Sequence, residues 1–410
     1  MPKILLLSRQ PLATRPLHDW LEGTADDIVL LTTPKAVVGA EDALAEHFPS
    51  HRLVDDYGGW STEQAAEEAA RAHGVDLVAS TSESDVLRAA RLRARLGLPG
   101  QDVASATAYR DKVVMKRTAR AAGIGVPPFA PVECPADLLE FIEDWGFPVV
   151  VKPRLGAGAK GMAILRGPAE VTAFLDREPT SEVPYLPGQW MVEDFVTADF
   201  FHVDGIMRDG RIVHAWPSAY LGSPGQRVHD KAPLGSVLLA PDDPRTALLR
   251  RMTQNVVAAL PAAPHPLAFH LEAWIPPDGE PVLCEIASRA GGALIGEAYE
   301  RAFGVLLARE GLRGQCGLPL ELTAQPTAPS APLGWALLPY GSNGFVPPSD
   351  SCPVPGAEVS LLSEADRRRG GVGPVEDPSA SVFVEAESAE SVRKLLEETM
   401  RWWCRNTESQ

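Results

Sequence analysis

Residues 149–165, VVVKPRLGAGAKGMAIL, form a glycine-rich stretch between two apolar runs. Gly156, Gly158 and Gly161 have the spacing G-x-G-x-x-G, which is typical of a dinucleotide-binding loop that opens a helix. Here the loop leads instead into an apolar run with strand character. The sequence therefore predicts a strand-loop-strand flap whose backbone N–H groups fold over phosphates. A surface hairpin with solvated lysines is the alternative for this loop taken alone.

Two lysines accompany the predicted flap. Lys152 lies near the end of the entering strand, where its ammonium can contact an α- or β-phosphate, and Lys160 lies in the flap itself. The motif alone does not decide between a phosphate site and a hairpin.

A hairpin further along the chain, LAFHLEAWIPPDGEPVLCEIASRAGG, offers paired carboxylates. If Asp278-Gly279 is a two-residue turn, Glu272 and Glu285 are direct cross-strand partners on one face. Opposed carboxylates repel unless a cation lies between them, and hard oxygen ligands suit Mg²⁺ bridging nucleotide phosphates. The alternative is a solvated edge, with the two prolines before the turn shifting the register by one residue.

Arg289 follows Glu285 by four residues and precedes Gly291 and Gly292. At the end of a strand, its guanidinium could hold a carboxylate or a transferred phosphoryl group.

The first hundred residues alternate apolar runs with helical patterns. KILLL, DIVLLT and VDLVAST are typical of strands, and STEQAAEEAARAHG and SDVLRAARLRARLG of helices, which predicts an open parallel sheet. Ser61 and Gln64 have the spacing of a capping box, and Gly74 stands where that helix would end. No glycine fingerprint follows the first strand, so we expect a nucleotide to bind elsewhere.

Prolines and changes in the pattern of predicted helices and strands divide the chain into three predicted regions. The first, 1–106, is the N-terminal α/β domain; the second, 107–320, contains a lid subdomain at about 128–193; the third, 321–410, is an α+β domain completing the catalytic core. The stretch TAQPTAPSAP is interpreted as the linker to the third region.

The middle region holds a further predicted hairpin, which turns at Asp209-Gly210. A Pro/Gly-rich loop follows it, and this loop carries His229 and Lys231. Both are candidates for charged groups near a phosphate, with simple solvation as the alternative.

Composition limits the partners. The formal net charge is −16, which argues against nucleic acid or an acidic membrane surface, and 45% hydrophobic with 22% charged residues is typical of a globular chain. The five cysteines include no C-x-x-C pair, so zinc and disulfide frameworks are not expected. No apolar run is long enough for a membrane span, so a cytoplasmic location is expected.

Together and in this order, these motifs resemble the ATP-grasp superfamily, in particular its carboxylate–amine ligases related to biotin carboxylase and bacterial amino-acid ligases. The resemblance extends from about the first strand to Gly292. It implies an α/β (α+β) fold with an N-terminal open parallel-sheet domain, a central lid subdomain, and a C-terminal antiparallel-sheet subdomain with an extra C-terminal segment.

The resemblance also assigns roles. RDKVVMK implies a lysine that reaches the nucleotide, VVVKPRLGAGAKGM the phosphate strand and flap, and MVEDFV an adenine hinge read through backbone groups. The residues implied to bind ATP are Lys112, Lys152, Gly156, Gly158, Lys160, Gly161, Met162, Glu193, Asp194, Val196 and Asp199. HLEAW and CEIASRAGG imply Glu272 and Glu285 as ligands for Mg²⁺, with Mn²⁺ as an alternative, and Arg289 as a catalytic arginine beside His229 and Lys231.

Two positions depart from the family pattern. Relatives often carry an asparagine two residues after the second metal glutamate, where this chain has Ala287, so metal binding would rest on two glutamates. Many relatives carry a ribose-binding glutamate just before the strand that contains HVDG in this chain, and Phe200 stands at that position here. Asp199 is the substitute considered, with an exposed turn aspartate as the alternative.

The resemblance implies an ADP-forming ligase. ATP would phosphorylate a carboxylate to an acyl phosphate, and an amine would attack it to give an amide, ADP and phosphate. The expected substrates are amino acids or a carrier-loaded amino acid, and a homodimer is an open alternative. The Ala/Arg/Pro-rich composition resembles that of high-G+C bacteria, where such ligases often build peptide-like secondary metabolites. The alternatives are an enzyme that activates bicarbonate or formate and an ATP-binding regulatory protein without catalysis.

Overall fold

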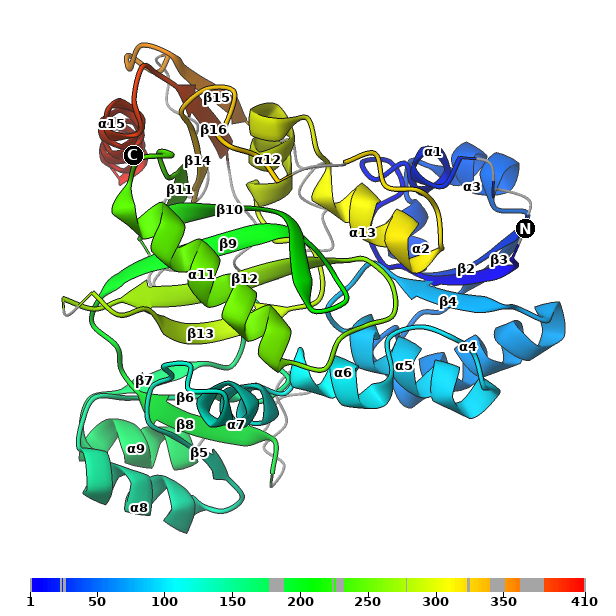
Figure 1. The fold of residues 1–410 in the computed structure, drawn as a ribbon, viewed down its shortest axis with the longest axis horizontal. Helices are drawn as coiled ribbons and strands as arrows, with labels where there is room; N and C mark the ends of the chain where they lie inside the picture. Colours follow the sequence, from blue (N-terminus) through cyan, green and yellow to red (C-terminus); the bar gives the residue numbers. More distant parts are fainter. Residues whose placement is uncertain are drawn as a thin grey trace.

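The computed structural model describes residues 2–22, 24, 27–176, 188–222, 225, 232–277, 279–322, 325–339, 351–361 and 380–408. Three sheets organise these residues, one for each large part of the molecule (Figure 1). No helix in these ranges is both long and apolar enough to span a bilayer.

The N-terminal sheet is parallel and open, as predicted, with strand order β3-β2-β1-β4. Strands β1, β2 and β4 are largely apolar because helices cover both faces: α4 and α5 pack on one, and α1, α3 and the distant α13 on the other. The edge strand β3, with the sequence SHRL, is mostly exposed. The elements are β1 (Ile4–Leu7), α1 (Leu17–Trp20), β2 (Ile28–Thr32), α2 (Pro34–Val37), α3 (Glu41–His47), β3 (Ser50–Leu53), α4 (Trp60–His73), β4 (Leu77–Ser80), α5 (Asp85–Leu96) and α6 (Val103–Ala108).

One detail of this region was predicted wrongly. Helix α4 begins at Trp60 with Gly59 as its N-cap, and no side chain caps it. Ser61 therefore lies inside the first turn and cannot form the expected capping box. Gly74 does end the helix, in the left-handed conformation with φ 60°.

The lid is a four-stranded antiparallel sheet with strand order β5-β8-β6-β7. Helices α8 and α9 bury its apolar side chains in one cluster, and α7 connects it to the N-terminal part. The elements are α7 (Lys112–Ala121), β5 (Phe129–Val132), α8 (Pro135–Trp145), β6 (Val149–Pro153), β7 (Ala163–Leu165), α9 (Pro168–Leu175) and β8 (Trp190–Asp194).

The largest sheet has eight antiparallel strands in the order β13-β12-β9-β10-β11-β14-β16-β15. Helices α7 and α11 cover one face, α12 and α13 the other, and α15 the C-terminal end (Figure 1). The elements are β9 (Asp199–Arg208), β10 (Arg211–Leu221), β11 (Leu234–Leu238), α11 (Pro244–Ala259), β12 (Leu267–Ile275), β13 (Val282–Ala287), α12 (Ile295–Phe303), α13 (Leu307–Gln315), β14 (Leu333–Leu338), β15 (Ala357–Leu361), β16 (Ala380–Glu385) and α15 (Ala389–Glu408).

The C-terminal strands continue this sheet, because β14 pairs with β11 and β16 with β14. The segment after the proline-rich stretch thus shares a hydrogen-bonded sheet with the hairpins before it. The division of the chain at residues 106 and 320 stays a prediction. The turn at Asp209-Gly210 is confirmed: both residues have positive φ, 51° and 71°, as a two-residue type I′ turn requires.

His265, close to the junction with the N-terminal region, makes stability depend on pH. Its Nε2 accepts a hydrogen bond from the backbone N–H of Gln101 at 3.2 Å, so this nitrogen must be unprotonated. Burial lowers the pKa of His265 to about 4. The unfolded chain, with a histidine pKa of about 6.5, binds the extra proton first, so this contribution is complete above pH 6.5 and is lost as the pH falls towards 4.

When the pH falls from 7 to 5, we expect the loss of the His265 contribution to lower the free energy of unfolding by about 2 kcal/mol. Urea unfolding of the native protein and of His265→Gln at both pH values gives the change in unfolding free energy of each protein between pH 7 and pH 5. The difference between these two changes is the contribution of His265. An equally steep loss in the variant would contradict it.

Candidate active site

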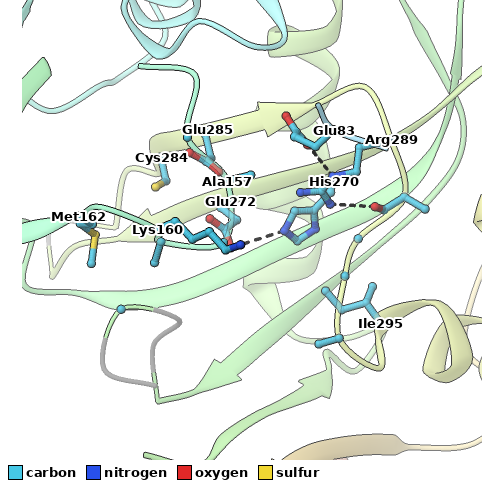
Figure 2. A pocket seen from close by; sticks show the side chains of 18 of the residues that line it. Glu83, Ala157, Lys160, Met162, His270, Glu272, Cys284, Glu285, Arg289 and Ile295 are labelled. Carbon is cyan, nitrogen blue, oxygen red and sulfur yellow. Dashed lines mark hydrogen bonds and ion pairs between the residues drawn. The ribbon is translucent and has the colours of Figure 1, made fainter. Parts of the chain in front are cut away.

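One cavity of about 1230 Å³ lies where the lid, the large sheet and the N-terminal sheet meet. It collects every described candidate of the sequence analysis except Gly161: Lys112, Lys152, Gly156, Gly158, Lys160, Met162, Glu193, Asp194, Val196, Asp199, Glu272, Glu285 and Arg289. Figure 2 shows the flap residues Lys160 and Met162 beside the carboxylates of the large sheet. His229 and Lys231 lie outside the described residues.

The glycine loop is a flap between two strands, as predicted. Strands β6 and β7 pair antiparallel, with Val149 opposite Leu165, so the loop opens no helix. Gly158 and Gly161 have φ values of 62° and 74°, a conformation that side chains with a Cβ rarely adopt. The dinucleotide interpretation is therefore excluded by the backbone that follows the loop.

Glu272 and Glu285 are direct cross-strand partners, as predicted. The structural cause of this pairing differs from the predicted one. Strand β12 ends at Ile275 and β13 begins at Val282, so the connection is longer than the expected two-residue turn. The register near this connection would leave the glutamates on opposite faces. A bulge at Cys284 shifts it by one residue and places both on the cavity side.

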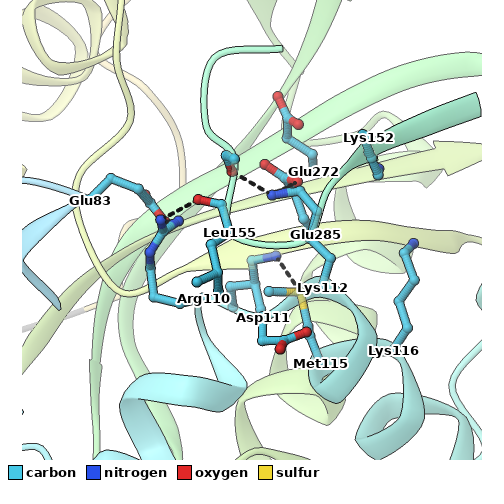
Figure 3. Close-up of polar contacts among 12 residues, drawn as sticks. Glu83, Arg110, Asp111, Lys112, Met115, Lys116, Lys152, Leu155, Glu272 and Glu285 are labelled. Carbon is cyan, nitrogen blue, oxygen red and sulfur yellow. Dashed lines mark hydrogen bonds and ion pairs between the residues drawn. The ribbon is translucent and has the colours of Figure 1, made fainter. Parts of the chain in front are cut away.

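Glu285 is held by a lysine in this structure. Lys112, the first residue of α7, places Nζ 2.9 Å from Glu285 Oε2 and donates a hydrogen bond of 2.7 Å to the carbonyl of Gly156 (Figure 3). Burial would raise the pKa of Glu285, but Lys112 and Lys152 outweigh burial and bring it to about 2. The carboxylate is therefore charged at neutral pH.

Glu272 has two partners on the same face of the sheet. Tyr220 Oη donates a hydrogen bond of 3.0 Å to Oε1, and His270 Nε2 lies 3.5 Å from the same oxygen. Asp204 accepts from His270 Nδ1 at 2.9 Å and contacts His202 Nδ1 at 2.5 Å. Despite burial, Asp204 and Glu272 raise the pKa of His270 to about 10, so a cation stands behind Glu272.

Lys152 belongs to a buried group of three charges. Its Nζ lies 2.5 Å from Glu193 Oε1, and Lys116 Nζ lies 3.2 Å from Glu193 Oε2. Burial would lower the pKa of Lys152, but Glu193 and Glu285 raise it above its usual value. Lys116 does not line the cavity, and burial lowers its pKa. Lys152 is thus a fixed cation in the cavity wall.

Arg289 is paired with a residue that the sequence analysis missed. Its Nε donates to Glu83 Oε2 at 2.5 Å, and the other oxygen of Glu83 binds Arg110 (Figures 2 and 3). Burial would lower the pKa of Arg289, but Glu83 raises it above the usual value.

The two departures from the family pattern have structural counterparts. Phe200 stacks against Tyr220 and lies against Trp274, with ring centroids 5.2 and 5.3 Å apart. Asp199 begins β9, is 80% exposed and lies 4.0 Å from Arg245. It lines the cavity, and its role towards a ribose stays a prediction. Ala287 is buried and supplies no polar atom beyond its backbone.

Local sequence signals could have found some of the missed residues. His270 is two residues before Glu272 on a strand, so both side chains share one face. Lys116 is four residues after Lys112 on one helix. Glu83 has no comparable signal, because its partner Arg289 is 206 residues away.

Comparisons with known proteins agree with this geometry. A family model described as the carbamoyl-phosphate synthase L chain, ATP binding domain, matches residues 111–211. An L-arginine-specific L-amino acid ligase of Bacillus subtilis is 29% identical over 255 residues, which cover 61% of this chain. The match spans only 60% of the length of that ligase.

Solved structures resemble the chain along almost its whole length. Carboxyaminoimidazole ribonucleotide synthase from Aspergillus clavatus, complexed with ATP, has a TM-score of 0.70 at 15% identity and covers 99% of both chains. An L-amino acid ligase from Bacillus licheniformis has a TM-score of 0.67 at 17% identity and covers 97% of both. The chain therefore shares the fold of these solved enzymes, and its residues 111–211 are similar to an ATP-binding domain.

Proposed function

We propose that the chain is an ATP-dependent carboxylate–amine ligase, which forms an amide between amino-acid-like substrates through an acyl phosphate and releases ADP and phosphate. The single observation that carries this proposal is the meeting of a phosphate flap, two opposed carboxylates and Arg289 in one cavity. The similarity to an L-amino acid ligase supports amino acids as the substrate class.

The donor atoms at the two glutamates suit a divalent cation. Glu272 and Glu285 offer hard carboxylate oxygens from adjacent strands, which is the donor set that Mg²⁺ or Mn²⁺ prefers. These residues would hold the ion. When bound, it would neutralise charge on the nucleotide phosphates.

The chain's own groups can perform the rest of the reaction. Lys152 and Lys112 bind and orient the phosphates, and the flap excludes water, which would otherwise hydrolyse the intermediate. An oxygen of the substrate carboxylate attacks the γ-phosphorus and ADP leaves. The amine nitrogen then attacks the acyl carbon, phosphate leaves with the carboxylate oxygen, and the nitrogen loses a proton. Arg289 stabilises the oxyanion.

ADP release over a matrix of amino acids, with and without hydroxylamine, tests this proposal. We expect ADP release that requires a carboxylate substrate, and a hydroxamate of that substrate when hydroxylamine replaces the amine. AMP as product would contradict the mechanism. ADP release only with bicarbonate or formate would favour that alternative, and ATP binding without turnover would favour a regulatory protein.

Three broader statements belong to the same proposal. A role in making peptide-like secondary metabolites is supported by the Ala/Arg/Pro-rich composition. A cytoplasmic location and a homodimer stay predictions, and light scattering of the purified chain would decide the second.

A further inference from the structure

Glu83 connects three parts of the molecule that are distant in sequence. It lies in the loop between β4 and α5, at the carboxyl end of the N-terminal sheet. Its two oxygens bind different arginines: Oε2 accepts from Arg289 Nε at 2.5 Å, and Oε1 binds Arg110 just before α7. Its side chain is only 13% exposed, and burial is outweighed by the arginines, which lower its pKa. Glu83 is therefore a charged anchor for both guanidinium groups.

This pairing leaves the Nη2 group of Arg289 available to donate hydrogen bonds to a ligand. Arg289 uses Nε for Glu83 and Nη1 for the carbonyl of Ala290 at 2.8 Å. Its Nη2 has no hydrogen-bond partner among the residues that the structure describes. A bidentate pair between Glu83 and Arg289 would occupy Nη2 together with Nε, and Nη2 is the group that remains to donate to a substrate carboxylate or phosphoryl group.

Arg110 prevents that bidentate pair by holding the other oxygen of Glu83. It also donates a hydrogen bond of 2.5 Å from Nη2 to the carbonyl of Leu155, at the base of the flap (Figure 3). The order of contacts is therefore Leu155, Arg110, Glu83, Arg289. One buried carboxylate shared by two arginines leaves a net positive charge at the reacting end of the cavity.

We propose that Glu83 is a positioning residue, which fixes the Arg289 guanidinium with Nη2 directed to the reacting groups and ties it through Arg110 to the base of the flap. This inference rests on the proposed ligase function for its kinetic consequence. Its structural consequence, the orientation of Arg289, does not depend on that function.

Glu83→Gln tests the inference, because the amide keeps the shape of the side chain and loses its charge. We expect kcat for ADP release to fall about 10- to 100-fold, since a displacement of about 1 Å of a reacting group has costs of this size. The KM for ATP should stay within about threefold, because Glu83 pairs with Arg110 and Arg289, whereas Lys112 and Lys152 pair with other carboxylates. A fall of less than about twofold in kcat, or a loss confined to KM, would overturn it.

Glu297→Gln is the matched control. Glu297 on α12 pairs with Arg15 at 3.4 Å and so also joins the N-terminal region to the large sheet, but it does not contact Arg289. We expect kcat within about twofold of the native value. In an Arg289→Lys background, Glu83→Gln should add less than about a threefold loss, because its effect passes through Arg289. A full additional loss would contradict the positioning role.

A crystal structure of Glu83→Gln with MgADP separates this inference from the proposed function. We expect the Arg289 guanidinium to leave its present position. An unmoved guanidinium would overturn the inference even if the native protein were a ligase. A displaced one would support it even if no acid and amine gave ADP. If Glu83→Gln does not fold, Glu83→Asp replaces it, because the shorter carboxylate cannot reach both arginines.

Discussion

Replacing Glu285 with glutamine is expected to lower kcat about 10²- to 10³-fold, which is the usual cost of removing one electrostatic contact to a transition state. Glu285 is charged, since Lys112 and Lys152 hold its pKa at about 2, and it faces Glu272 across the strands. The glutamine amide removes the negative charge that would bind a divalent cation. It leaves Lys152 and Lys160, the lysines at the flap, in place. The affinity for ATP, measured by calorimetry, should therefore change by less than about fivefold.

Glu280→Gln is the control for this variant. Glu280 is exposed in the connection of the same hairpin and does not line the cavity. Its substitution should leave both kcat and ATP affinity unchanged. Turnover retained in Glu285→Gln would contradict the metal assignment, and an equal loss of ATP binding would show that Glu285 serves mainly to hold the fold.

Lys152→Met is expected to raise the Kd for ATP about 10- to 100-fold. Lys152 is a buried cation that lines the cavity, and a charged hydrogen bond to a phosphate contributes about 1.5–3 kcal/mol. Methionine keeps much of the volume and removes the charge. Calorimetric titration with ATP at a temperature well below the unfolding transition gives the change directly.

Lys116→Met separates binding from stability. Lys116 pairs with the same carboxylate, Glu193, and is fully buried, but it does not line the cavity. Both variants leave Glu193 with one lysine and should lower the free energy of unfolding, by about 3 kcal/mol. Only Lys152→Met should weaken ATP binding. Equal weakening in both variants would contradict direct contact between Lys152 and the nucleotide.

The sequence predicted those features that depend on local pattern. The parallel N-terminal strands follow from short apolar runs between helical patterns, and the type I′ turn follows from Asp209-Gly210. The flap was distinguishable from a dinucleotide loop because Ala163–Leu165 is a strand. Each of these signals lies within about ten residues of the element it predicts.

The pairing of Glu272 with Glu285 was predicted by symmetry about a two-residue turn, which the hairpin does not have. The longer connection would have moved the glutamates to opposite faces, and the bulge at Cys284 restores their alignment. Leu283 and Ile286 are both buried in the cluster on the far face, which only a bulge permits. Such a bulge cannot be located from the two-residue alternation of side chains, because the bulge interrupts that alternation.

The contacts of Glu83 and Glu193 could not be predicted, for a different reason. Each carboxylate is charged in a buried place because two cations from other elements surround it. Nothing within a few residues of Glu83 indicates Arg110 or Arg289. Such groups become visible only when the three sheets are assembled around the cavity.

The most direct test of the central claim uses a carboxylate substrate labelled with ¹⁸O at both oxygens, chosen from those that support ADP release. If the carboxylate attacks the γ-phosphorus, the phosphate released after amide formation carries one ¹⁸O atom, and mass spectrometry of the phosphate counts it. We predict one ¹⁸O per phosphate, in a yield equal to ADP. Unlabelled phosphate alongside amide, or labelled AMP, would contradict an acyl-phosphate ligase.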